Sequence, residues 1–318
     1  RSPPSWRPTA AAPPLVVAPL LADARLLGRN ATTMSAVPPT PPASIVIPTL
    51  GRADYLEVAL GSLLPQVHAA GAEVVVVNDG GDPETERIAA QAGAHVVSHP
   101  ERRGVNAARN AGIRASRSEL VILLDDDVEV APRWLEAMLA GARENPDCDV
   151  LGGPIAGRLE GGPRSCGREP PPITTYDFGP RDRDVPFIFG ANMALRRSAF
   201  ERIGYFDEEL SGRGDEEEWV RRYTAAGGRI RYLARALTIH RRAPDDARLG
   251  ALTRAAYAQG REARRHDIRV GAARSIPAEL RILVGCAWHT ARRRCAYGIV
   301  MGAKAAGSLR EALAERGA

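Results

Sequence analysis

The sequence predicts an α/β protein built on a mostly parallel sheet, and two patterns indicate this class. Along residues 44–156, short apolar runs alternate with segments whose apolar side chains recur at helical spacing. Such alternation is typical of βαβ units, whose strands pair in parallel. The second pattern is the run 120–127, Leu-Val-Ile-Leu-Leu-Asp-Asp-Asp, which suits a strand buried on both faces that ends in three carboxylates. Open α/β sheets bind ligands at this end of their strands.

The first elements follow from local patterns. Strands are expected at 44–48, 73–78, 95–98, 120–125 and 149–156, and the second of these contains a run of valines. Helices are expected at 54–64, 82–92, 104–115 and 132–145. Asp82 suits the cap of the second helix and Pro83 its first turn.

The later part of the chain predicts a different order. Residues 158–186 are rich in Gly, Pro and Arg, which indicates a long loop over an active site. A strand-like run at 236–239 ends in His240, and residues 251–318 are expected to be helical with breaks near 271–277. Residues 1–43 are rich in Pro and Ala and are expected to be disordered, and one alternative is that translation begins at Met34. We therefore expect three parts: a disordered segment 1–43, an α/β domain 44–245 and a basic helical extension 246–318.

Composition indicates a globular protein that does not span a membrane. Of 318 residues, 44% are apolar and 25% are charged, and no apolar run is long enough for a membrane-spanning helix. The four cysteines show no C-x-x-C motif and no paired metal spacing, which favours a reduced, cytoplasmic context.

Positive charge is concentrated in the last part of the chain. The net charge is +5, but residues 251–318 contain 13 Lys or Arg against 5 Asp or Glu. These residues include Arg292, Arg293 and Arg294, and apolar residues such as Trp288 lie beside them. One interpretation is a basic amphipathic helix that binds an anionic membrane surface, at the inner face of the plasma membrane. The other is a solvated arginine face on helices that pack against the α/β domain. We expect no nucleic-acid partner.

The three carboxylates after the fourth strand predict a cation site. Asp125 and Asp127 offer oxygens that suit a hard divalent ion, which can in turn bridge phosphates. The alternative is a solvated acidic turn or a helix N-terminus, since Pro132 and Trp134 begin a helical stretch.

Six motifs in order resemble those of family 2 glycosyltransferases. They are Ile47-Pro48-Thr49, Val77-Asn78-Asp79-Gly80, the stretch from Arg103-Gly104 to Asn110, Leu124-Asp125-Asp126-Asp127, Phe189-Gly190-Ala191-Asn192-Met193 and Gly214-Asp215-Glu216-Glu217-Glu218-Trp219. The resemblance covers roughly residues 44–242. It implies a GT-A fold, in which a Rossmann-like, mostly parallel sheet is flanked by helices. It also implies a nucleotide-diphosphate sugar as donor and transfer with inversion.

The resemblance assigns residues to the nucleotide. Base and ribose are expected at Pro48, Thr49, Arg52 and Asp79, whose carboxylate suits a uracil N–H or a ribose hydroxyl. The family often has Asp-Asp-Gly-Ser where this chain has Asn78-Asp79-Gly80-Gly81, and a tight turn would account for the same residues. The diphosphate is expected at the N-terminus of the helix that begins near Gly104. The residues that the resemblance assigns to it are Arg103, Gly104, Asn106, Arg109 and Asp126. Asn106 and Asn110 would alternatively tie this helix to the sheet.

The remaining roles also follow from the resemblance. Asp125, Asp127 and His240 are the expected ligands of Mn²⁺ or Mg²⁺. Glu216 is the expected general base, with Asp215 as the alternative, because the two acids are exchanged relative to the family pattern. Both acids also suit a helix N-terminus. The acceptor side is expected at Gly190, Asn192, Met193 and Trp219.

These roles predict a metal-dependent, inverting hexosyl- or deoxyhexosyl-transferase. Its acceptor would be a hydroxyl group of a cell-envelope or lipid-linked glycan, or of a natural product. One alternative is a nucleotidylyltransferase, but residues 49–53 are too short for the Gly-rich basic loop of that class. The other alternative is a sugar-nucleotide-binding module without catalysis.

Overall fold

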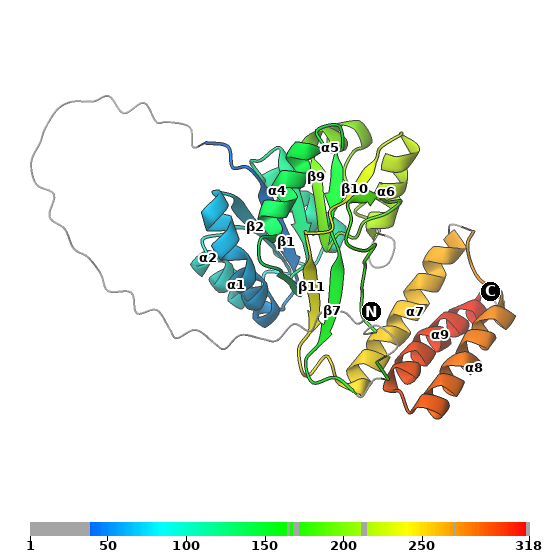
Figure 1. Cartoon of the computed structure of the whole chain (residues 1–318). Helices are drawn as coiled ribbons and strands as arrows, with labels where there is room; N and C mark the ends of the chain where they lie inside the picture. The colour runs from blue at the N-terminus through cyan, green and yellow to red at the C-terminus, as the bar shows by residue number, and fades with distance from the viewer. Residues whose placement is uncertain (1–38, 164–165, 168–171, 211–214, 270, 316–318) are drawn as a thin grey trace, which may run out of the picture. The chain divides into compact units, whose positions relative to one another are not determined.

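The computed structural model describes residues 39–163, 166–167, 172–210, 215–269 and 271–315 (Figure 1). Most of the segment 1–43 therefore lies outside the described residues. The chain from Thr40 to Ala318 forms one compact unit.

The first half of this unit is a parallel sheet with helical crossovers. Strands β1 (Ser44–Thr49), β2 (Glu73–Asp79), β3 (His95–His99) and β4 (Leu120–Leu124) pair in the order β3-β2-β1-β4, all in parallel. Helices α1 (Ala53–Ala70), α2 (Pro83–Gln91) and α3 (Val105–Ala115) connect them. The predicted elements are present, although α1 continues past residue 64 to end at Gly71, whose φ of 66° suits glycine.

The apolar strands are buried because helices cover both faces of the sheet. Successive side chains of a strand point to opposite faces. In β1, Ile45 and Ile47 therefore belong to one hydrophobic core, and Val46 belongs to the other. The core on the face of Val46 receives α3, where a Cβ on Gly112 would lie 2.3 Å from a Val46 methyl group.

The second half of the sheet differs from the expected order. Strand β9 (Asn192–Arg196) lies antiparallel between β4 and β6 (Val150–Gly152), and β10 (Ile230–Tyr232) and β8 (Arg183–Asp184) complete the sheet. The single strand predicted at 149–156 is in fact two strands, because the chain leaves the first sheet at Gly153 and Pro154. A Cβ on Gly153 would lie 2.0 Å from the Ala236 carbonyl oxygen, so only glycine permits this approach.

A small second sheet lies next to the carboxyl end of β4. Its order is β5-β11-β7, from β5 (Val128–Val130), β11 (Thr238–Arg242) and β7 (Ile155–Leu159). Strand β5 follows directly after the three carboxylates, and β11 contains His240. This pairing brings two distant parts of the sequence to one place.

The remaining helices complete the fold. They are α4 (Trp134–Glu144), α5 (Arg197–Ile203), α6 (Asp215–Ala225), α7 (Leu249–Arg269), α8 (Ile276–Arg293) and α9 (Ala296–Ala314). The last three pack side by side (Figure 1). The predicted break near 271–277 separates α7 from α8, and a second break at Arg294, with φ of 48°, was not predicted. None of the helices within the described ranges is both long and apolar enough to cross a bilayer.

Candidate active site

A cavity of about 1060 Å³ opens at the carboxyl ends of the parallel strands. Its walls include Thr49 at the end of β1, Asp79 at the end of β2 and Asp125 after β4. The loop residues 172–175 and parts of α7, α8 and α9 form other walls. Parallel α/β sheets bind ligands at this edge, so the predicted position of the site agrees with the cavity.

Asp79 joins the end of β2 to the start of α3. Its Oδ1 accepts hydrogen bonds from the backbone N–H of Arg103 and from Nδ1 of His99, each at 2.8 Å. Its Oδ2 accepts from the backbone N–H of Gly104, also at 2.8 Å. Burial raises the pKa of Asp79, but these hydrogen bonds and the His99 ring outweigh burial and hold the pKa below its usual value. Asp79 is therefore an anionic acceptor at the pocket wall.

Asp126 is bound by groups that were expected to contact the nucleotide. The Thr49 hydroxyl donates to its Oδ2 at 2.7 Å, and Arg52 Nε donates to the same oxygen at 3.1 Å. A second nitrogen of Arg52 pairs with Oδ1. The Asp126 oxygens thus position the Arg52 guanidinium beside the pocket, which both residues line together with Pro48.

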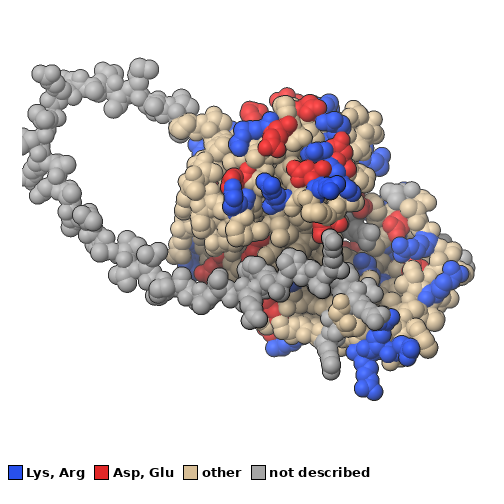
Figure 2. Space-filling view, viewed as in Figure 1, with Lys and Arg blue, Asp and Glu red and all other residues tan. Residues whose placement is uncertain are grey.

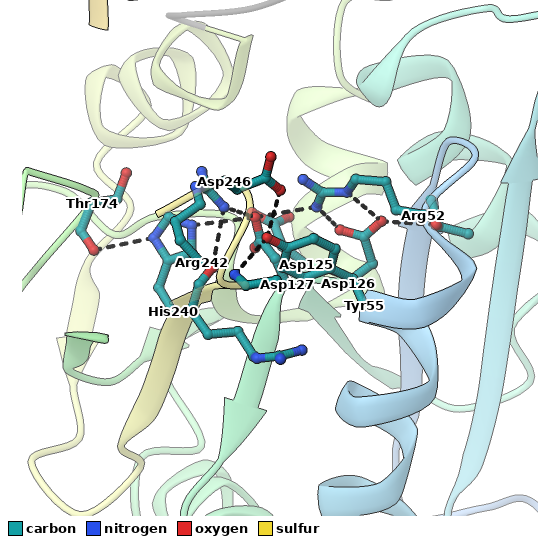
Figure 3. Close-up of polar contacts among 12 residues, drawn as sticks. Arg52, Tyr55, Asp125, Asp126, Asp127, Thr174, His240, Arg242 and Asp246 are labelled. Atoms are coloured by element: carbon teal, nitrogen blue, oxygen red, sulfur yellow. Dashed lines mark hydrogen bonds and ion pairs between the residues drawn. The ribbon is translucent and has the colours of Figure 1, made fainter. Parts of the chain in front are cut away.

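Asp127 lies at the centre of a cluster of basic side chains (Figure 3). Arg242 pairs with its Oδ2, and Arg52 Nη2 lies 3.2 Å from the same atom. Nε2 of His240 lies 3.3 Å from it. Burial opposes ionisation of Asp127, yet the His240 hydrogen bond and these charges together hold its pKa far below the usual value.

The arrangement of His240 and Asp127 fits two ligands of one divalent cation. Nδ1 of His240 lies 3.2 Å from the Thr174 carbonyl oxygen, which suits an N–H at Nδ1 and leaves a lone pair on Nε2. In that tautomer a cation bound between Nε2 and the Asp127 oxygen would take the place of the proton of their hydrogen bond. Carboxylate oxygens with an imidazole suit Mn²⁺. The Arg242 side chain shares the same oxygen, so it would have to yield part of that contact.

Asp125 and Glu216 both approach the buried Arg109. Nη2 of Arg109 lies 3.7 Å from Asp125 Oδ1, and Nη1 lies 3.6 Å from Glu216 Oε2. Oε1 of Glu216 also lies 3.5 Å from the Gly190 backbone nitrogen, which donates to it. Burial raises the pKa of Asp125; Arg109 offsets only part of this, and the Asp127 and Glu216 charges add to it. The Asp215 side chain lies outside the described residues, so this geometry concerns Glu216 alone.

The expected acceptor-side residues lie behind the pocket wall, which corrects that part of the prediction. Asn192, Met193 and Trp219 are all 0% exposed. The Asn192 amide donates to the carbonyls of Pro154 and Ala236, and Trp219 Nε1 donates to the Gly204 carbonyl. Gly190 is buried as well. The neighbours Phe189 and Ala191, in the turn that precedes β9, line the cavity instead.

Two residues expected at the diphosphate are occupied by protein partners. The Arg103 guanidinium lies 3.1 Å from Glu208, away from the cavity. Only the backbone N–H of Arg103 donates a hydrogen bond to Asp79. Asn106 donates to the Asp207 carbonyl at 2.8 Å and accepts from Arg109 at 3.3 Å. Asn106 therefore positions Arg109 and ties α3 to the segment before α6, whereas the alternative had predicted a tie to the sheet.

Several pocket residues escaped the sequence analysis. Arg102 lines the cavity although Arg103 was expected there. Arg242 was noticed only as the neighbour of His240, and its contact with Asp127 depends on the pairing of β11 with β5. The pocket walls from α7, α8 and α9 carry no motif, so no sequence signal could have found them.

The family of the chain follows from its similarity to known proteins. The sequence model described as "Glycosyl transferase family 2" matches residues 44–204, half of the chain. The chain belongs to glycosyltransferase family 2. The match includes the strands and loops that carry Asp79, Asp125 and Asp127.

Two curated relatives illustrate the similarity. The chain is 30% identical over 224 residues to a pre-mycofactocin glycosyltransferase of Mycobacterium tuberculosis, a match that covers 66% of this chain and 46% of that protein. It is 26% identical over 221 residues to a glucosyl-dolichyl phosphate glucuronosyltransferase of Haloferax volcanii, which covers 62% of this chain and 68% of that protein. The chain thus spans less than half of the mycobacterial relative.

A solved structure supports the fold. GalNAc-T7, solved with UDP, GalNAc and Mn²⁺, superposes with a TM-score of 0.52 at 17% identity and covers 68% of this chain and 47% of that one. The predicted GT-A fold, a mostly parallel sheet flanked by helices with further helices at the C-terminus, is confirmed.

Proposed function

We propose that this family 2 protein transfers a sugar from a nucleotide-diphosphate sugar to a hydroxyl group, with inversion at the anomeric carbon. One arrangement carries the proposal. In a cavity at the strand ends, the two terminal nitrogens of Arg109 lie within 4 Å of Asp125 and of Glu216. A cation for the leaving diphosphate thus stands beside a carboxylate that can act as a base.

The chemistry assigns a separate task to each group. The acceptor oxygen attacks the anomeric carbon, its proton passes to Glu216, and the bond from carbon to the diphosphate oxygen breaks. The diphosphate leaves with the negative charge, and Arg109 stabilises that charge. Asp215 remains the alternative base. Asp79, with Pro48, Thr49 and Arg52, would hold the base and ribose.

A divalent cation, Mn²⁺ or Mg²⁺, would be held by Asp125, Asp127 and His240. When bound, it would neutralise the charge that develops on the diphosphate. The tautomer of His240 favoured by the Thr174 carbonyl supports its role as a ligand. The crystal of GalNAc-T7 contained Mn²⁺ together with UDP, which is consistent with this choice of ion.

The acceptor is proposed to be a hydroxyl-bearing molecule with an apolar portion. The far wall of the cavity comes from α8 and α9 and presents Ile282, Val300 and Met301. An apolar wall suits a lipid-linked glycan or a natural product better than a free sugar. One relative is named as acting on a glucosyl-dolichyl phosphate and another, from Streptomyces hygroscopicus, as a validoxylamine A glucosyltransferase, so both acceptor classes occur among relatives.

The same helices support peripheral contact with an anionic membrane. Leu280, Val284 and Trp288 recur at intervals of one helical turn on α8 and are 45%, 68% and 68% exposed. Helix α8 also carries Arg281, Arg292 and Arg293, and Lys and Arg side chains are scattered over the helical part of the surface (Figure 2). An exposed apolar stripe with flanking arginines is the pattern of helices that lie in a membrane interface. We place the protein at the cytoplasmic face of such a membrane.

A nucleotidylyltransferase is less well supported. Its triphosphate substrate would need free basic groups after β1, and the one basic residue there, Arg52, is held by Asp126 and Asp127. A binding module without catalysis would not need Glu216 in the cavity.

Ligand-dependent thermal stability tests the proposal first. We expect UDP or GDP to raise the melting temperature in the presence of Mn²⁺ and to do so far less after chelation, because a ligand that binds only the folded state stabilises it. Slow metal-dependent hydrolysis of a matching sugar nucleotide should follow. Metal-independent binding of nucleotides would contradict the metal assignment, and binding without any hydrolysis or transfer would favour the non-catalytic module.

A further inference from the structure

A second cluster of metal-binding side chains lies at the far wall of the same cavity, where His289 lines it, and it shares no residue with the set Asp125, Asp127 and His240. Cys166, in the loop after β7, meets His289 near the end of α8 and Cys295 just before α9. Within the described residues this is the one set of three His, Cys, Asp or Glu whose ligand atoms all lie within 4.8 Å of one another. The partners of Cys166 are 123 and 129 residues away along the chain, so no local spacing motif could have revealed the cluster.

The distance between the ligand atoms of Cys166 and His289 matches that in a tetrahedral zinc site. Cys166 Sγ lies 3.6 Å from His289 Nε2. Zinc bonds of about 2.3 Å to sulfur and about 2.05 Å to nitrogen, at a tetrahedral angle, separate the two ligand atoms by about 3.6 Å. Two sulfurs and one imidazole nitrogen are ligands that zinc prefers. Three protein ligands leave the fourth position to water.

The position of Cys295 suits a metal ligand. Its side chain is fully buried, and the backbone N–H of Cys166 donates to its Sγ at 3.3 Å. Cys295 is also the N-cap residue of α9, so the start of that helix fixes its position. When zinc is bound, its positive charge would be the partner that a buried sulfur ligand needs.

We propose that Cys166, His289 and Cys295 bind a zinc ion, with water as the fourth ligand, and that this ion fastens the loop after β7 to the junction of α8 and α9. The fastened loop continues into residues 172–175, which line the cavity, and the Thr174 carbonyl contacts His240. Zinc would therefore fix one wall of the pocket from a distance. The inference does not depend on the proposed reaction.

Metal content gives the direct test. The chain is purified without a histidine tag, dialysed and analysed for bound metals, and we expect about one zinc per chain, since structural zinc resists dialysis. Cys166→Ser and His289→Asn should each lose nearly all of it. Cys286→Ser is the matched control, because Cys286 lies one turn before His289 on α8 and also borders the cavity but is outside the three-residue set. Equal loss in Cys286→Ser, or no zinc in the parent chain, would overturn the assignment.

Two further measurements distinguish a zinc site from a disulfide. Replacement of zinc by Co²⁺ should produce a thiolate-to-cobalt absorption band that Cys166→Ser lacks. The intact mass of fresh, unreduced protein should show all cysteines as thiols, whereas a mass lower by two hydrogens together with a Cys166–Cys295 cross-linked peptide would replace the zinc site by a disulfide.

Limited proteolysis tests the fastening role of the zinc ion. Chelation should expose the loop 160–182 to protease while circular dichroism of the remaining fold stays unchanged. The Cys286→Ser control should respond to chelation as the parent does. A loop equally resistant before and after chelation would contradict the fastening role.

Discussion

One oxygen of Asp127 contacts three basic side chains, and the first prediction follows from these contacts. Asp127→Asn removes the negative charge that His240, Arg242 and Arg52 share. We expect the variant to stay folded, since the amide keeps an acceptor, but to lose the Mn²⁺-dependent thermal stabilisation by UDP or GDP. Metal-dependent binding of either nucleotide by Asp127→Asn would remove Asp127 from the metal site.

Asp246→Asn is the control for this substitution. Asp246 lies in the same region and accepts a hydrogen bond from Tyr55 at 2.7 Å, yet it belongs to neither the metal set nor the nucleotide set (Figure 3). Its variant should keep the metal-dependent stabilisation. A comparable loss in both variants would mean that any charge change in this cluster disturbs the site.

Glu216→Gln tests the general base. Donor binding should persist, while the rate of transfer should fall by a factor on the order of 10²–10⁴, the usual contribution of a general base. Glu217→Gln is a matched control in the same helical turn. Among the described residues, Glu217 pairs with His266 at 3.2 Å and not with Arg109. Single-turnover rates and donor affinity separate the two effects. If Asp215→Asn is the more damaging change, Asp215 is the base.

Tyr55 makes a prediction about alkaline pH. Its hydroxyl donates to Asp246 at 2.7 Å and accepts from the Ala243 N–H at 2.8 Å, and burial together with Asp246 raises its pKa to about 12. The folded state thus holds this proton more tightly than the unfolded state, whose tyrosine pKa is about 10. The stabilisation is complete below pH 10 and is lost as the pH rises through 12. Tyr55→Phe should lower the free energy of unfolding by about 1 kcal/mol at pH 8.

The comparison of the two proteins at several pH values measures this effect. Urea unfolding of parent and variant should give a difference that shrinks between pH 10 and pH 12, since other tyrosines affect both equally. A constant difference over that range would show that the Tyr55 proton is not held by the fold.

Single residues were predictable where a strand end specifies their position. Asp79, Asp125 and Asp127 lie at or just after the ends of apolar runs, so the sequence indicates their place in the sheet. Asp79 and Asp125 line the cavity, and Asp127 contacts Arg52, which lines it too. Asn192 and Trp219 belong to a motif too, but a motif does not say which side chains face the core, and these two are buried. Cys166 and His289 have no local signal, because their proximity depends on how the last helices pack.

Helix α3 provides a prediction about packing. Gly112 faces β1 and β2, and a Cβ there would lie 2.3 Å from Val46 Cγ1 and 3.0 Å from Val77 Cγ2. Both valines are stiff, buried side chains, so Gly112→Ala should cost about 1–3 kcal/mol through overpacking. Gly61→Ala in α1 is the matched control: no atom lies within 4 Å of its Cβ position, and alanine should stabilise that helix by about 0.5–1 kcal/mol. Urea unfolding measures both, and equal effects would contradict close packing of α3 at Gly112.

The order of elements was predictable only where neighbours in sequence are neighbours in the sheet. The crossovers from β1 to β2 and from β2 to β3 join neighbouring strands, and the expected parallel pairing is present there. The connection from β3 to β4 passes β2 and β1, so β4 lies beside β1. Strand β9 enters the sheet between β4 and β6 from far along the chain, and the small sheet takes β7 and β11 from separate regions. An apolar run such as 149–156 indicates a buried strand but not which sheet it joins, so its division at Gly153 was missed.

The basic C-terminal part lines the cavity, and the proposed membrane contact would be a second role beside it. The two interpretations were a membrane-binding helix and a solvated face on helices that pack against the α/β domain. The helices do provide walls of the cavity, through residues such as Gln259 of α7 and Lys304 of α9. At the same time α8 leaves an apolar stripe exposed, so the lining of the cavity and the proposed membrane contact use different faces of the same bundle.

The exposed stripe and the charge of the whole chain lead to the last prediction. Because residues 251–318 carry 13 Lys or Arg against 5 Asp or Glu, we expect reversible binding to vesicles that contain anionic lipid. Added salt should weaken the binding, since exposed charges are screened within about 10 Å at 0.1 M salt. Reversal of Arg292, Arg293 and Arg294 to Glu should reduce co-sedimentation strongly, and Trp288→Ala should reduce it at every salt concentration because it removes apolar contact. Reversal of three exposed arginines of the α/β domain to Glu, Arg87, Arg133 and Arg229, controls for net charge because it changes the charge by the same amount. If the parent chain stays in the supernatant at low salt, the bundle serves the pocket alone and its arginines are simply solvated.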